Sequence, residues 1–197
     1  MRSGIMAVSV EGISVQQVGY EQIDAFIEKL VMAAAEKESL PERQELEAII
    51  RDGGGLLIEA KALALYVKPR FSEDTDYLVD GRTFQRVRAW FRDHRDRIDY
   101  DDGGEAIACE PLGIDVVDAR NHPVLLEIAR RESVVPSAEA LAAMKYCSAI
   151  NPARKRRDQD AVDFRSLVKL PGFDDAKCLG YFVDNSHSNV IRLFFMR

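Results

Sequence analysis

Two aspartates, Asp74 and Asp76, stand two residues apart just before an apolar run in the segment RFSEDTDYLVD. The run YLV is typical of a buried β-strand, and residues two apart on a strand point to the same face. Burying one carboxylate is costly, and two carboxylates on one face disfavour each other's ionisation. Two acids at the beginning of a core strand therefore need water or a cation beside them.

The remainder of the chain mixes segments of helical periodicity with short apolar runs that are bounded by glycine, proline or polar residues. The helices that we expect lie at residues 20–38, 41–52, 60–66, 82–97, 122–132, 137–150 and 160–170. The strands that we expect lie at residues 56–58, 75–80, 105–109 and 114–117. This pattern predicts an α/β (α+β) fold in which strands and helices alternate in the middle of the chain and helices dominate afterwards.

Two units follow from this pattern. Residues 1–120 form the predicted α/β core with N-terminal helices, and residues 121–197 form a C-terminal helical portion. A short hairpin around Asn185 and Ser186 is expected to end the chain. The first 15 residues lack the apolar length of a secretory signal and predict a short leading strand.

Composition argues against several other classes of protein. The 197 residues carry a net charge of −6, which does not favour a general nucleic-acid-binding surface. No apolar run approaches the roughly 20 residues that a membrane span needs. The three cysteines contain no Cys-x-x-Cys pair and the three histidines are scattered, so neither a disulfide framework nor a zinc site is indicated. We expect a cytoplasmic protein that does not bind membranes.

A divalent cation is one way to relieve the repulsion between Asp74 and Asp76. Mg²⁺ prefers one or two carboxylates together with phosphate oxygens and water. Asp115 is the best candidate for a third acid, because it is isolated inside the apolar strand GIDVV. A solvated strand edge or an Asx turn also explains an Asp-x-Asp spacing, so the spacing alone leaves both interpretations open.

The flanking segments narrow the choice. LLIEAKALALYVKPRFSEDTDYLV contains a strand, a helix and then Arg70, Ser72, Asp74 and Asp76, while SAEALAAMKYCSAINPARKRRDQDAVDFRSLV places Lys145 on a helix before a basic turn and an Asp-x-x-Asp helix. In this order the segments resemble the nucleotidyltransferase superfamily, particularly the minimal nucleotidyltransferases and relatives of the abortive-infection type II toxins.

The resemblance covers about residues 38–170 and implies a nucleotidyltransferase-type mixed sheet flanked by helices, with a C-terminal helical half. It also implies that Asp74, Asp76 and Asp115 are catalytic and bind two Mg²⁺ ions. In such an enzyme the ions bind an NTP and activate an acceptor hydroxyl, which attacks the α-phosphorus and releases pyrophosphate. The acceptor is a protein, an RNA or a small molecule.

The resemblance further implies that Arg70, Ser72 and Lys145 bind the nucleotide. One departure concerns the family's glycine pair, which aligns with Glu59 and Ala60. Glycine suits a close approach of the backbone to phosphates, whereas glutamate adds bulk and negative charge. The sequence therefore leaves open whether the chain is active or is a catalytically degenerate binding module, for example in a toxin–antitoxin or phage-defence pair with a protein partner.

Two basic segments have alternative interpretations. The helix at residues 82–97 carries six arginines interleaved with acids, which indicates either a solvated face with ion pairs or an RNA-facing surface. The run RKRR at residues 154–157 is either an exposed turn or a contact for phosphates. A nucleic-acid-binding protein is therefore the third hypothesis, which the net negative charge makes the weakest of the three.

Overall fold

The computed structural model describes residues 31–68, 72, 74–183 and 191. Residues 31–39 are helical, in agreement with the second half of the helix expected at 20–38. The predicted leading strand and the centre of the predicted terminal hairpin, at Asn185 and Ser186, lie outside the described residues. Within the described part of the chain, no helix combines the length and the apolar character that crossing a membrane requires.

The described residues form a five-stranded mixed sheet with the order β1-β2-β5-β4-β3. The strands are β1 (Leu56–Ile58), β2 (Thr75–Val79), β3 (Asp101–Asp102), β4 (Ala106–Cys109) and β5 (Ile114–Asp118). β2 and β5 are parallel neighbours at the centre, and every other pairing is antiparallel. The four strands predicted between residues 56 and 117 are therefore confirmed. β3 was missed because its two residues are exposed acids, which carry none of the apolar alternation that predicts a strand.

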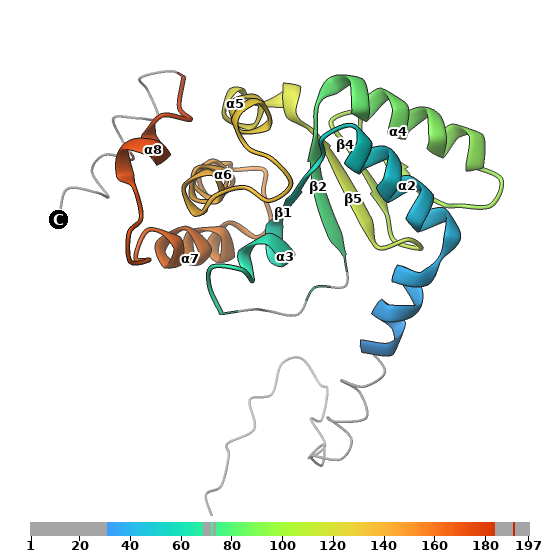
Figure 1. Ribbon diagram of the computed structural model, residues 1–197, viewed down its shortest axis with the longest axis horizontal. Helices are drawn as coiled ribbons and strands as arrows, with labels where there is room; N and C mark the ends of the chain where they lie inside the picture. Colours follow the sequence, from blue (N-terminus) through green and yellow to red (C-terminus); the bar gives the residue numbers. More distant parts are fainter. Residues whose placement is uncertain (1–30, 69–71, 73, 184–190, 192–197) are drawn as a thin grey trace, which may run out of the picture.

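Helices cover both faces of the sheet (Figure 1). They are α2 (Pro41–Asp52), α3 (Glu59–Leu63), α4 (Gly81–His94), the 3₁₀ helix η1 (Ala119–Asn121), α5 (Pro123–Arg131), α6 (Ala138–Ile150), α7 (Arg157–Leu167) and α8 (Asp175–Leu179). Figure 1 places α2 and α4 on one side of the strands and α5 to α8 on the other. The predicted fold class, a mixed sheet flanked by helices, is confirmed.

Each face of the sheet has its own apolar core. On one face, Phe84 and Trp90 of α4 pack with Val116 of β5. On the other face, Leu78 of β2 packs with Leu141 of α6 and the other helices of that side. Because the helices after η1 share this second core with the strands, the units 1–120 and 121–197 are packed together, and their division remains a prediction.

The acids of the opening motif sit at the edge of the second core. Leu56 and Leu78 are register partners on β1 and β2, and Ile58 pairs with Asp76, two residues nearer the start of β2. Asp76 therefore lies on the same face of β2 as the core residue Leu78, but at the edge of the core. Thr75 lies on the opposite face, as expected for a residue between two acids on a strand, and is buried.

Arg43 of α2 fixes that opposite face. Its side chain is only 2% exposed, and it donates hydrogen bonds of 2.7 Å to the carbonyl oxygen of Leu112 and of 2.7 Å to Oγ1 of Thr75. Lys61 of α3 donates to the same Thr75 oxygen over 2.7 Å. Because Leu112 precedes β5 and Thr75 begins β2, these contacts tie together the ends of the two strands that carry the acids.

Replacing Arg43 with methionine should destabilise the protein by about 3 kcal/mol, because buried acceptors lose their charged donor. Urea unfolding measures the change in the free energy of unfolding. Arg51→Met on the same helix is the matched control, since Arg51 is exposed, and it should stay within about 0.5 kcal/mol of the unaltered protein. Equal stabilities of the two variants would show that the Arg43 contacts do not hold the strand ends.

Candidate functional site

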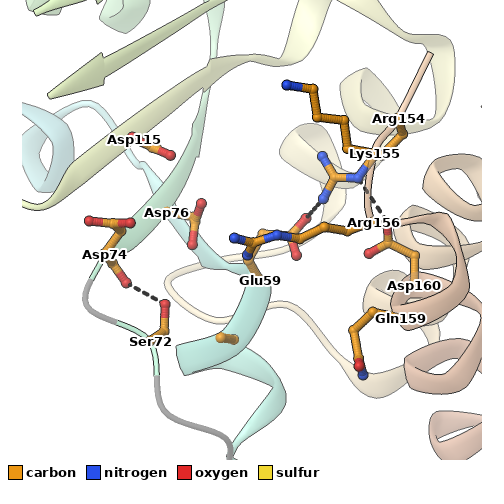
Figure 2. Close-up of a pocket in the computed structure, with 11 residues that line it drawn as sticks. Glu59, Ser72, Asp74, Asp76, Asp115, Arg154, Lys155, Arg156, Gln159 and Asp160 are labelled. Carbon is orange, nitrogen blue, oxygen red and sulfur yellow. Dashed lines mark hydrogen bonds and ion pairs between the residues drawn. The ribbon is translucent and has the colours of Figure 1, made fainter. Parts of the chain in front are cut away.

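A cavity of about 590 Å³ opens between the sheet and the turn that precedes α7. Figure 2 shows acids on the sheet side, cationic side chains on the helical side and Glu59 between them. The residues that line the cavity are Glu59, Ala60, Ser72, Asp74, Asp76, Asp115, Arg154, Lys155, Arg156, Gln159 and Asp160. Segments from both predicted units therefore build one site.

The acidic wall follows from strand register. Asp76 of β2 and Asp115 of β5 are direct partners on neighbouring parallel strands, so their side chains share a face. Asp74 precedes Asp76 by two residues, and its backbone carbonyl accepts a hydrogen bond of 3.2 Å from Oγ of Ser72. The structure thus brings together the three acids that the sequence singled out.

The acids disfavour one another's ionisation. The pKa of Asp76 is raised from 3.8 to about 7, chiefly by burial and then by the negative charges of Glu59, Asp115 and Asp74. Burial also raises the pKa of Asp115, with Asp74 contributing in the same direction. A group of carboxylates with raised pKa values in a cavity is typical of a functional site.

The opposite wall is cationic and comes from the segment between α6 and α7. Arg154 and Lys155 lie in this turn, and Arg156 is the residue before the first turn of α7. Arg154 donates from Nε to Oδ2 of Asp160 over 2.7 Å, and its side chain is 38% exposed. This wall therefore has cations that a ligand can reach.

Lys145 of α6 lies behind this wall and is not one of the residues that line the cavity. Its side chain is 2% exposed, and its ammonium group pairs with Glu59, with Asp160 at 2.8 Å and with Asp163 at 3.5 Å. Burial alone lowers the pKa of Lys145, but the neighbouring carboxylates of Glu59 and Asp160 reverse the effect and hold the pKa above its ordinary value. Lys145 is therefore a charged residue at the centre of an ion-pair network.

Glu59 links this network to the acidic wall. It directly follows Ile58, the register partner of Asp76, and it begins α3. Its backbone has a φ of 54°, a left-handed conformation that glycine adopts far more readily than glutamate. Its carboxylate pairs with Lys145 and, over 3.1 Å, with Nη2 of Arg154. This position thus has a backbone suited to glycine while carrying a charged side chain.

The remaining predicted residues differ in their placement. Ser72 lines the cavity, whereas Arg70 lies outside the described residues. Of the basic run at 154–157, the first three residues line the cavity, and Arg157 donates to the carbonyl oxygen of Ala149 over 3.0 Å. In the arginine-rich helix, Arg88 forms hydrogen bonds of 2.7 and 2.8 Å with Asp102 of β3, so this ion pair joins the helix to the sheet rather than two residues of the helix.

Sequence reasoning did not single out Gln159 and Asp160 as lining residues, although Asp160 opens the Asp-x-x-Asp helix. It also missed Arg43. A signal was available for Arg43, because it shares the helical face of Leu46 and Ile50 at a spacing of three and seven residues. A charged residue on such an apolar stripe indicates a buried ion with dedicated partners.

The donor set of the acidic wall fits a divalent metal. Carboxylate oxygens are the ligands that Mg²⁺ prefers, and it commonly takes one or two of them with phosphate oxygens and water. Among the described residues, no group of three His, Cys, Asp or Glu side chains stands ready to hold a metal ion. The acidic wall therefore offers suitable oxygens rather than a complete cage of protein ligands.

Comparison with models of protein families found no match, and comparison with curated proteins found none either. Among solved structures, the chain is similar to the Megavirus polyadenylate synthase, with a TM-score of 0.43 and 12% sequence identity. The alignment covers 85% of this chain and 40% of that chain, so this chain spans less than half of the other's length. At this distance the likeness assigns neither a family nor an activity to the chain.

Asp76→Asn should stabilise the protein in the presence of a chelator, and more strongly at about pH 8 than at about pH 5. Because the folded-state pKa of Asp76 is about 7 and the ordinary value is 3.8, folding takes up a proton between these values and stability falls as pH rises. Asparagine has no charge to develop, so its advantage grows over this window to on the order of 1–3 kcal/mol.

Urea unfolding at the two pH values measures the difference in the free energy of unfolding. Asp93→Asn on the exposed face of α4 provides a matched control for the loss of one carboxylate. If Asp76→Asn changes the free energy of unfolding by the same amount at both pH values, burial and the neighbouring acids do not raise the pKa of Asp76.

Proposed function

We propose that this protein is a Mg²⁺-dependent nucleotidyltransferase that transfers a nucleotidyl group from an NTP to a hydroxyl of a protein, RNA or small-molecule acceptor. The observation that carries the proposal is the convergence of Asp74, Asp76 and Asp115 on one wall of a cavity whose opposite wall is cationic. Phosphoryl chemistry needs both features, because a metal site orients the reacting groups and cations neutralise the phosphate oxygens.

Each wall has a distinct role. Asp74, Asp76 and Asp115 would hold the metal, which when bound supplies charge neutralisation for the phosphate oxygens. Arg154, on the other wall, is accessible and can donate to phosphate oxygens, as guanidinium groups do in fork geometry. Lys155 and Arg156 add charge along the same wall.

Asp115 is also the candidate base. Its carboxylate lines the cavity beside Asp74 and Asp76, and burial raises its pKa in the metal-free protein. In the proposed step the acceptor hydroxyl transfers its proton to the Asp115 carboxylate while its oxygen bonds to the α-phosphorus. The bond from the α-phosphorus to the bridging oxygen breaks, and pyrophosphate leaves with that electron pair. Ser72 lines the cavity and would contact the nucleotide.

One observation favours a second candidate function. Glu59 places a fourth carboxylate beside Asp76 and already occupies cationic groups of the helical side. This negative charge would repel the phosphates of a nucleotide, whereas a glycine at the same position would not. The alternative is therefore a catalytically degenerate binding module with the same fold, acting through a protein partner such as the other component of a toxin–antitoxin or phage-defence pair.

Asp74→Asn and Asp76→Asn should each lower nucleotidyl transfer by at least about 100-fold, because each removes a metal-binding oxygen. The measurement is the transfer of α-labelled nucleotide, from each of the four NTPs with Mg²⁺, to a mixture of cellular protein and RNA, together with release of pyrophosphate. Asp93→Asn on α4 removes an exposed carboxylate far from the cavity motif and should leave the rate unchanged.

Transfer that survives both Asp74→Asn and Asp76→Asn would remove these residues from the site. Calorimetry separates the two candidate functions. The enzyme binds an NTP with Mg²⁺ and turns it over. The binding module shows no transfer from an NTP, and its Asp76→Asn variant still binds the protein partner.

A further inference from the structure

Glu59 lies where the two walls of the cavity meet. Its side chain is 19% exposed, and its carboxylate contacts Lys145 and Arg154 from the helical side. Its negative charge is also the strongest electrostatic influence on Asp76 of the sheet. In Figure 2 the side chain stands between the acids and the cationic turn. Glu59 is therefore the counter-ion of the cationic wall and, at the same time, a source of repulsion for the acidic wall.

The network would stay paired if Glu59 moved away. Lys145 keeps Asp160 at 2.8 Å and Asp163 at 3.5 Å. Arg154 keeps the hydrogen bond from its Nε to Asp160, which holds the guanidinium in place. The group that would change partner is Nη2 of Arg154, which donates to Glu59 over 3.1 Å. Departure of Glu59 from Arg154 thus presents an oriented donor to the cavity and leaves Lys145 and Arg154 each paired with Asp160.

The backbone at Glu59 has a φ of 54°, which is unfavourable for a residue with a Cβ and suits glycine. The carboxylate at its end is held by two cations, Lys145 and Arg154. Replacing Glu59 with glycine therefore removes the carboxylate while suiting the local backbone.

We propose that Glu59 is an internal competitor for a polyphosphate ligand, which binds by taking the place of the Glu59 carboxylate on Arg154. A phosphate oxygen accepts the same charge-assisted hydrogen bond from a guanidinium as a carboxylate does. Lys155 and Arg156 line the cavity beside Arg154. A chain of several phosphates can therefore contact more cations than the single carboxylate of Glu59 can. The identity of the ligand as the phosphate chain of an NTP rests on the proposed function.

The test is calorimetry with inorganic tripolyphosphate in a chelator, which needs neither metal nor catalysis. Glu59→Gln removes the charge and keeps the shape, and Glu59→Gly suits the left-handed backbone, so two independent variants report on the same carboxylate. Each should bind tripolyphosphate about tenfold more tightly than the unaltered protein, because the competing anion is gone. Glu38→Gln is the matched control, since Glu38 forms an exposed ion pair with Lys61 at 2.9 Å.

The Arg154 contact is tested by a double-mutant cycle. Arg154→Met in the Glu59→Gln background should abolish the gain in tripolyphosphate affinity, whereas additive effects of the two changes would overturn the proposal. An affinity of both Glu59 variants equal to that of Glu38→Gln would overturn it as well. If affinity rises as expected but no variant transfers nucleotides, the competition stands and the transferase function fails. If nucleotides are transferred but the Glu59 variants do not change the affinity for tripolyphosphate, the transferase function stands and the competition fails.

Discussion

Repulsion among four partly buried carboxylates is the constraint on which the site depends. Asp74, Asp76, Asp115 and Glu59 line a single cavity, and burial raises the pKa of two of them, Asp76 and Asp115. The strands provide no cation on this face of the cavity. The compensation comes from α6 and the turn before α7, through Lys145 and the basic residues of the turn. The charge of the site therefore links the helical half of the chain to the sheet, in addition to the apolar core that they share.

The acidic wall depends on contacts made on the other face of the sheet. Thr75 points away from the acids and receives hydrogen bonds from Arg43 and Lys61. Arg43 also reaches the carbonyl oxygen before β5. These contacts fix the ends of two parallel strands relative to each other, and the register between the strands sets the spacing of Asp76 and Asp115. The like charges of the acidic wall thus stay close together because hydrogen bonds on the other face of the sheet keep β2 and β5 from separating.

Local patterns predicted the acidic wall, whereas long-range contacts determined the rest of the site. The alternation of a strand was sufficient to place Asp76 on the face opposite Thr75, and the apolar surroundings of Asp115 singled it out. No local pattern pairs Glu59 with Lys145 and Arg154, since these residues are brought together by the packing of α3, α6 and α7. The positive φ of Glu59 was also beyond sequence reasoning, because glutamate rarely adopts it.

If the site binds a nucleotide, as we propose, the pairing of Glu59 suggests how the charge of this glutamate is offset during binding. A nucleotide that carries Mg²⁺ brings two opposite charges, a cation for the acidic wall and a polyanion for the cationic wall. Polyphosphate alone would release Glu59 from Arg154 and leave its charge facing Asp76, whereas a metal arriving with the phosphates offsets that added repulsion. Glu59 would therefore make binding of the phosphate chain depend on the metal more strongly than the three aspartates of the acidic wall would alone.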